Sequence, residues 1–85
     1  MKADRKQILE KLTEIILFAD ETARERCPVM DENTRILEDL GFTSVAMLYM
    51  AVSIEEAFNV RLDDVNVWDL HTLGDAVSLI ERKMA

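Results

Sequence analysis

Ser44 is the residue whose type and setting point most directly to chemistry. It lies in the segment 38–45 (EDLGFTSV), where Gly41 ends a loop, Thr43 can cap a helix and Ser44 falls in the first turn of that helix. A hydroxyl in a first turn is exposed and lies beside unpaired backbone N–H groups. These groups and the positive end of the helix dipole favour a covalently attached phosphate. We therefore expect Ser44 to be an attachment point.

A hydrolytic role for Ser44 would need a general base and an orienting acid. The only histidine, His71, belongs to no recognisable constellation, and there is no Gly-x-Ser-x-Gly turn. Cys27 has no neighbours at metal-ligand spacing, and the paired acids at 55–56 and 63–64 lack the oxygen-rich pattern of a calcium loop. We expect neither a catalytic nor a metal site.

The net charge of −7 is distributed unevenly. Residues 1–30 balance six acids against six bases, whereas residues 31–75 carry ten acids against two bases. A field of that sign around Ser44 repels nucleic acid and acidic membrane surfaces and favours basic protein partners. The simpler interpretation is that an acidic surface keeps a small protein soluble.

The length of 85 residues predicts one domain, 1–85, with a single modest core and no deep pocket. The lone Cys27 excludes an internal disulfide and fits a reducing compartment. The N-terminal residues lead into an amphipathic stretch rather than a signal peptide, and no apolar run is long enough to insert in a membrane. We expect a cytoplasmic monomer.

The hydrophobic spacing predicts an all-α fold, a four-helix bundle of three longer helices and a short third one. The first helix is expected from about Asp4 to Ala19, followed by a long loop from 20 to 42 in which three apolar side chains reach the core: Ile36, Leu37 and Leu40. The second helix is expected from Ser44 to about Phe58. A short helix near 63–70, with Trp68 as a packing residue, precedes a last helix capped by Thr72 and Asp75.

The second helix is apolar on two sides. Its expected core face consists of Met47, Met50, Ala51, Ile54 and Phe58, with Leu48 at its border. Val45, Tyr49 and Val52 cluster on the opposite side, which a domain of this size cannot easily bury. These three residues either form a surface for a partner or pack under the long loop. If exposed, they could also support a weak dimer.

The sequence resembles the acyl and peptidyl carrier proteins from roughly Ile8 to Ile80. The segment 40–45 (LGFTSV) is similar to that family's Leu-Gly-x-Asp-Ser-Leu motif, and the segment 54–58 (IEEAF) is similar to its Leu-Glu-Glu-x-Phe ending of the second helix. The resemblance implies that Ser44 accepts a 4′-phosphopantetheine arm from coenzyme A, added by a separate phosphopantetheinyl transferase. The chain would then be a non-catalytic carrier of thioester intermediates in fatty-acid, polyketide or related biosynthesis.

The resemblance also implies that acyl- or aminoacyl-loading enzymes and synthases dock on the second helix. Thr43 replaces the motif's aspartate, so it can cap the helix but offers no charge to the transferase. Ala46 and Tyr49 stand where fatty-acid carriers often have acids. The expected partner-binding residues are Val45, Tyr49, Val52, Glu38, Asp39, Glu55 and Glu56. A peptidyl or aminoacyl carrier and an unmodified helical adaptor with the carrier fold are the alternatives.

Overall fold

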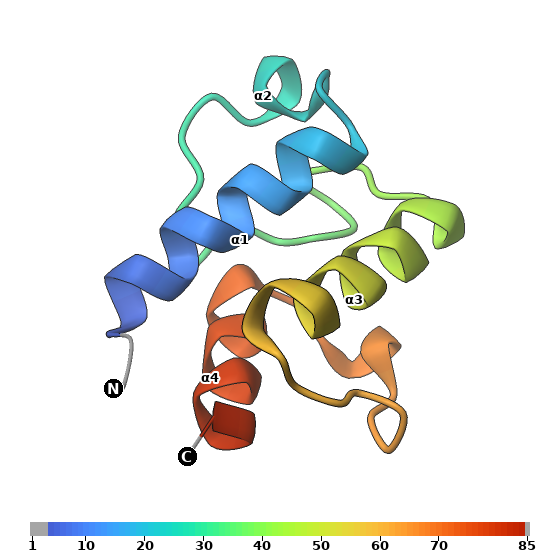
Figure 1. Cartoon of the computed structure of the whole chain (residues 1–85). Coiled ribbons are helices and arrows are strands. Elements are labelled where there is room, and N and C mark those ends of the chain that lie inside the picture. Colours follow the sequence, from blue (N-terminus) through green and yellow to red (C-terminus); the bar gives the residue numbers. More distant parts are fainter. Residues whose placement is uncertain (1–3, 85) are drawn as a thin grey trace.

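The computed structural model describes residues 4–84, and its regular elements are helices joined by irregular segments (Figure 1). Its elements are α1 (Arg5–Ala19), α2 (Ala23–Arg26), α3 (Ser44–Phe58), the 3₁₀ turn η1 (Val67–Asp69) and α4 (Leu73–Met84). Within residues 4–84 there is no strand, and a single antiparallel bridge joins Arg35 to Thr72. The all-α expectation is confirmed. No helix in this part of the chain is long and apolar enough to cross a membrane.

Helix α1 begins with a capping box and buries one side. The Asp4 carboxylate accepts the Gln7 amide at 2.8 Å, and the Gln7 side-chain oxygen accepts the Asp4 amide at 3.2 Å. The side chains that α1 buries recur every three or four residues: Ile8, Leu12, Ile15 and Ile16. Figure 1 shows α1 lying across the molecule, and it packs on both α3 and α4.

Helix α4 closes the core from the other side. The Thr72 hydroxyl accepts the Asp75 amide at 3.1 Å, and the Asp75 carboxylate accepts the Thr72 amide at 3.1 Å, so the predicted capping pair is confirmed. The buried residues of α4 are Leu73, Ala76, Val77, Leu79 and Ile80. The start of α1 lies beside α4, where the Arg5 guanidinium donates to the Ser78 hydroxyl at 3.1 Å and binds both Glu81 and Glu32.

The long connection is ordered by contacts with the start of α4. The Ile36 amide donates to the His71 carbonyl at 2.9 Å, and the Leu73 amide donates to the Thr34 carbonyl at 3.0 Å. Ile36 and Leu40 are fully buried, as expected, but the prediction that Leu37 reaches the core is wrong because its side chain is exposed. The connection also contains α2, which the sequence pattern did not predict.

The expected short helix near 63–70 is reduced to η1, and Trp68 is exposed rather than packed. The Asn66 side chain accepts the Trp68 amide at 3.1 Å, while the Val65 amide closes a turn on Leu62 at 3.0 Å. Such local turns compete with an α-helix. Leu70 is the buried residue of this segment, and Val65 and Val67 are half-buried against the core.

Candidate functional site

Ser44 is the first residue of α3, and its side chain is exposed. Thr43 precedes it in extended conformation, and the Thr43 hydroxyl accepts the Ala46 amide at 3.2 Å, so the predicted cap is confirmed. The first intrahelical bond runs from the Met47 amide to the Thr43 carbonyl at 3.0 Å. The amides of Ser44 and Val45 come before that bond in the helix, where backbone N–H groups have no intrahelical acceptor.

The loop before Ser44 is shaped by a glycine between two buried residues. Gly41 has a φ of +66°, in the left-handed region, while Leu40 and Phe42 are buried on either side of it. The two apolar side chains anchor the loop, and Gly41 lets it turn between them. Ser44 therefore stands at the exposed end of α3 on a segment whose position the core determines.

One side of α3 is apolar and faces solvent. The exposed fractions are 74% for Val45, 44% for Tyr49 and 53% for Val52, so these residues do not pack under the long loop. Leu48, at the border of the expected core face, is 60% exposed and belongs to the same patch. We call these four residues the α3 patch. Met47, Met50 and Ile54 are buried on the opposite side, whereas Ala51 and Phe58 are only half-buried.

Three of the four acids expected to bind partners already have partners inside the chain. Glu38 forms an ion pair with Arg35. Asp39 accepts the Arg35 amide at 2.8 Å and pairs with its guanidinium at 3.1 Å, and these bonds lower the pKa of Asp39. The Glu55 carboxylate accepts the Leu62 amide at 2.8 Å and so holds the loop that follows α3.

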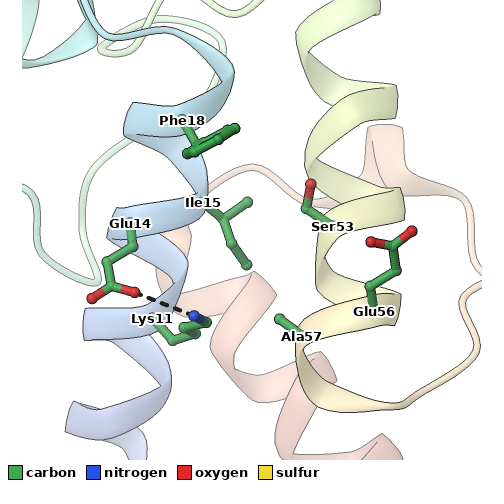
Figure 2. Close-up of a pocket in the computed structure, with 7 residues that line it drawn as sticks. All are labelled: Lys11, Glu14, Ile15, Phe18, Ser53, Glu56 and Ala57. Atoms are coloured by element: carbon green, nitrogen blue, oxygen red, sulfur yellow. Dashed lines mark hydrogen bonds and ion pairs between the residues drawn. The ribbon is translucent and has the colours of Figure 1, made fainter.

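Glu56 differs from these acids because it is exposed and has no ion-pair partner within residues 4–84. It borders an open groove of about 340 Å³ between α1 and α3. Figure 2 shows Ile15 and Phe18 projecting from α1 toward α3, with Ala57 facing them. Phe18 is 83% exposed. This groove was not predicted from the sequence, although Phe18, a large apolar residue outside the buried stripe of α1, is a signal for it.

Residues 4–84 contain no cluster of three or more His, Cys, Asp and Glu that could hold a metal ion. His71 is exposed, and its backbone amide donates to Asp75 at 3.0 Å as part of the start of α4. Cys27 is a free thiol at the end of α2. Within the described residues, none of these groups forms a hydrogen bond with the Ser44 side chain. Ser44 is therefore an isolated exposed hydroxyl at the start of a capped helix.

The sequence profile of the phosphopantetheine attachment site matches residues 10–80. The chain belongs to this carrier family. It is 32% identical to the acyl carrier protein of Thermotoga maritima, over 96% of this chain and 98% of the relative. It is 36% identical to the acyl carrier protein of Arthrobacter sp. strain FB24, over 98% of this chain and 99% of the relative. It is 31% identical to that of Tropheryma whipplei strain Twist, over 94% of each.

The cofactor of the family is phosphopantetheine, and the start of α3 fits it. A phosphodiester on a first-turn hydroxyl would lie beside backbone N–H groups that have no intrahelical acceptor, at the positive end of the helix. The exposure of Ser44 leaves room for a flexible arm. When bound, the arm supplies a thiol on which a carried group is held as a thioester.

Proposed function

We propose that this chain is an acyl carrier whose 4′-phosphopantetheine arm is attached to Ser44. The observation that supports this most strongly is the exposed Ser44 hydroxyl at the capped start of α3, within the part of the chain that matches the attachment-site family. In the loading reaction the Ser44 oxygen bonds to phosphorus of the coenzyme A diphosphate. This phosphorus is the one that carries the pantetheine half. Its bond to the oxygen that bridges the two phosphorus atoms breaks, the nucleotide half leaves with that oxygen and the electron pair, and a base of the transferase takes the serine proton.

The chain itself performs no turnover under this proposal. It tethers an intermediate and presents it at high effective concentration to the enzymes that dock beside Ser44. These partners are a phosphopantetheinyl transferase, loading enzymes and synthases. The free thiol of Cys27 is compatible with work in the reducing cytoplasm.

The α3 patch is proposed as the surface that these enzymes cover. It begins one residue after Ser44 and runs along the helix for two turns, with Glu56 a further turn along. Covering Val45, Leu48, Tyr49 and Val52 would remove exposed apolar surface from water, which favours association. Glu38, Asp39 and Glu55 would contribute less, because each already has a partner inside the chain.

The attachment is tested by intact mass after incubation with coenzyme A and a broad-specificity phosphopantetheinyl transferase. The parent should gain the mass of one arm and Ser44→Ala none. Ser53→Ala, in the same helix, is the matched control and should be loaded like the parent. Loading of Ser44→Ala would show that another residue carries the arm. No gain by the parent, even with a transferase from its native source, would favour the unmodified adaptor.

The docking surface is tested with Tyr49→Asp. The side chain is half exposed, so the variant should fold, but its charge would be placed in the centre of the α3 patch. Burying an unpaired carboxylate is costly, and we expect at least a tenfold loss in partner turnover. Val29→Asp makes the same kind of change at an exposed apolar residue of the long connection and should leave turnover intact. Equal kinetics for Tyr49→Asp and the parent would exclude this surface.

The identity of the carried group distinguishes the remaining alternative, a peptidyl or aminoacyl carrier. The relatives named above are acyl carrier proteins, which favours an acyl cargo. Mass analysis of the loaded protein isolated from its native source would decide the point, because an amino acid and an acyl chain add different masses to the same arm.

A further inference from the structure

The loop that leads to Ser44 is held by a side chain from another part of the chain, Arg26, the last residue of α2. Arg26 Nε donates a hydrogen bond to the carbonyl oxygen of Leu40 at 2.9 Å. The same side chain lies against Gly41, where a Cβ would come 3.1 Å from Arg26 Nε. Arg26 therefore contacts the two residues at which the loop turns toward Thr43 and Ser44.

The Arg26 side chain is held by two residues that follow α1, Asp20 and Thr22. Its Nη1 donates to the Thr22 hydroxyl at 3.0 Å, and its Nη2 forms an ion pair with Asp20. Asp20 caps α1, since its amide donates to the Ile16 carbonyl at 2.9 Å. Hydrogen bonds from Thr22 and then from Arg26 lower the pKa of Asp20, so the carboxylate remains charged near neutral pH. Three nitrogens of one planar group thus bind three different partners.

The side chains of Leu40 and Phe42 anchor the segment 40–43 in the core, and the Leu40 amide donates to the Arg35 carbonyl at 3.2 Å, but the backbone beyond Leu40 has few other hydrogen bonds. The Phe42 amide reaches the Ile36 carbonyl only at 3.5 Å, and Gly41 is exposed in a conformation that glycine adopts at no steric cost. The bond from Arg26 is the shorter contact, and it comes from a segment that α1 holds in place. Removing it would let the segment 40–43 adopt other conformations while the core stays packed.

We propose that Arg26 is a positioning residue for the attachment reaction, which holds the segment 40–43 in the conformation that the transferase binds. This inference rests on the proposed attachment at Ser44. An enzyme that binds one conformer sees its affinity reduced by the fraction of molecules in that conformer. Loss of the Arg26 side chain should therefore raise the KM for the carrier and leave kcat nearly unchanged. A carrier that is already bound to the transferase has its loop in the required conformation.

The test compares Arg26→Ala, Arg26→Lys and Arg24→Ala as substrates of a phosphopantetheinyl transferase, with loading followed by intact mass. Arg24→Ala is the matched control, since it removes the same charge from the same short helix and its side chain is exposed. We expect Arg26→Ala to raise KM by about three- to tenfold with kcat within about twofold. Arg26→Lys keeps one donor and should fall between Arg26→Ala and the parent, whereas Arg24→Ala should match the parent.

Amide hydrogen exchange distinguishes a positioning role from general destabilisation. Arg26→Ala should speed exchange at the hydrogen-bonded amides of Phe42, Ala46 and Met47 and leave the buried amides of α1 and α4 protected. Equal KM values for Arg26→Ala and Arg24→Ala, or exchange that accelerates equally in all helices, would overturn the inference while attachment at Ser44 stands. If the parent gains no arm, the proposed attachment fails and this inference fails with it.

Discussion

Two substitutions of Thr43 test two separate effects on stability. One removes the hydroxyl that caps α3, and the other adds the negative charge that the family's aspartate would supply at this position. The Thr43 hydroxyl satisfies one orphan amide of α3, that of Ala46, at 3.2 Å. Thr43→Val keeps the shape and removes that acceptor, which costs about 1 kcal/mol for an N-cap. Thr43→Asp keeps an acceptor and adds a negative charge at the positive end of a helix whose first turn has no acid, worth about 0.3–1 kcal/mol.

Thermal unfolding followed by circular dichroism converts these energies into measurable shifts. For a domain of this size, 1 kcal/mol corresponds to about 4–8 °C in Tm. We expect Thr43→Val to melt about 4–8 °C below the parent and Thr43→Asp about 1–8 °C above it at low salt. Only the Thr43→Asp gain should shrink in about 1 M salt, because a charge near the helix end is screened and a neutral hydrogen bond is not.

Thr13→Val is the matched control for the lost hydroxyl. The Thr13 hydroxyl donates to the Leu9 carbonyl at 2.8 Å inside α1, where that carbonyl already has a helical partner. Its loss should change Tm little. A parent-like Tm for Thr43→Val, or equal losses for Thr43→Val and Thr13→Val, would refute the assignment of Thr43 as the cap that stabilises α3.

Two further variants test the loop and the ion pairs. Gly41→Ala places a Cβ at a φ of +66°, 3.1 Å from Arg26 Nε, and should lower the free energy of unfolding by about 1–2 kcal/mol. Gly41→Asn should lower it less, because asparagine tolerates this conformation better. Equal Tm values for Gly41→Ala and the parent would contradict this. Hydrogen bonds from Arg5 lower the pKa of Glu32, so this pair stabilises the fold fully above the unfolded pKa of about 4.3 and is lost as pH falls through the lower folded value. Arg5→Gln should therefore melt below the parent at neutral pH and approach it near pH 3, whereas a difference independent of pH would exclude the pair as its cause.

The parts of the fold that could be predicted from the sequence depend on local chemistry. Thr43 as a cap and the pair of Thr72 and Asp75 follow from side chains that bond to amides three residues away. The exposed side of α3 follows from helical spacing and the small size of the domain. These features need no knowledge of distant residues.

The parts that could not be predicted depend on contacts between distant segments. Ile36 and Leu40 reach the core and Leu37 does not, in a segment that is held against the start of α4 by the bond from the Ile36 amide to the His71 carbonyl. The contact between Arg26 and the Leu40 carbonyl spans 14 residues without any periodic signal. The hydrogen bond between the Glu55 carboxylate and the Leu62 amide also has no periodic signal in the sequence. Arg35 and Glu38, by contrast, are three residues apart, a spacing that indicates an ion pair on a turn.

The internal pairing of the acids also bears on how partners recognise α3. A carboxylate already bound to Arg35 or to a backbone amide gains less from a partner's cation than a free one does, because the partner must replace an existing bond. The α3 patch has no such competing contact, and its four apolar side chains remain exposed beside Ser44. Docking as proposed would therefore derive most of its affinity from apolar burial next to Ser44, with the acidic field of residues 31–75 acting mainly on the rate of encounter.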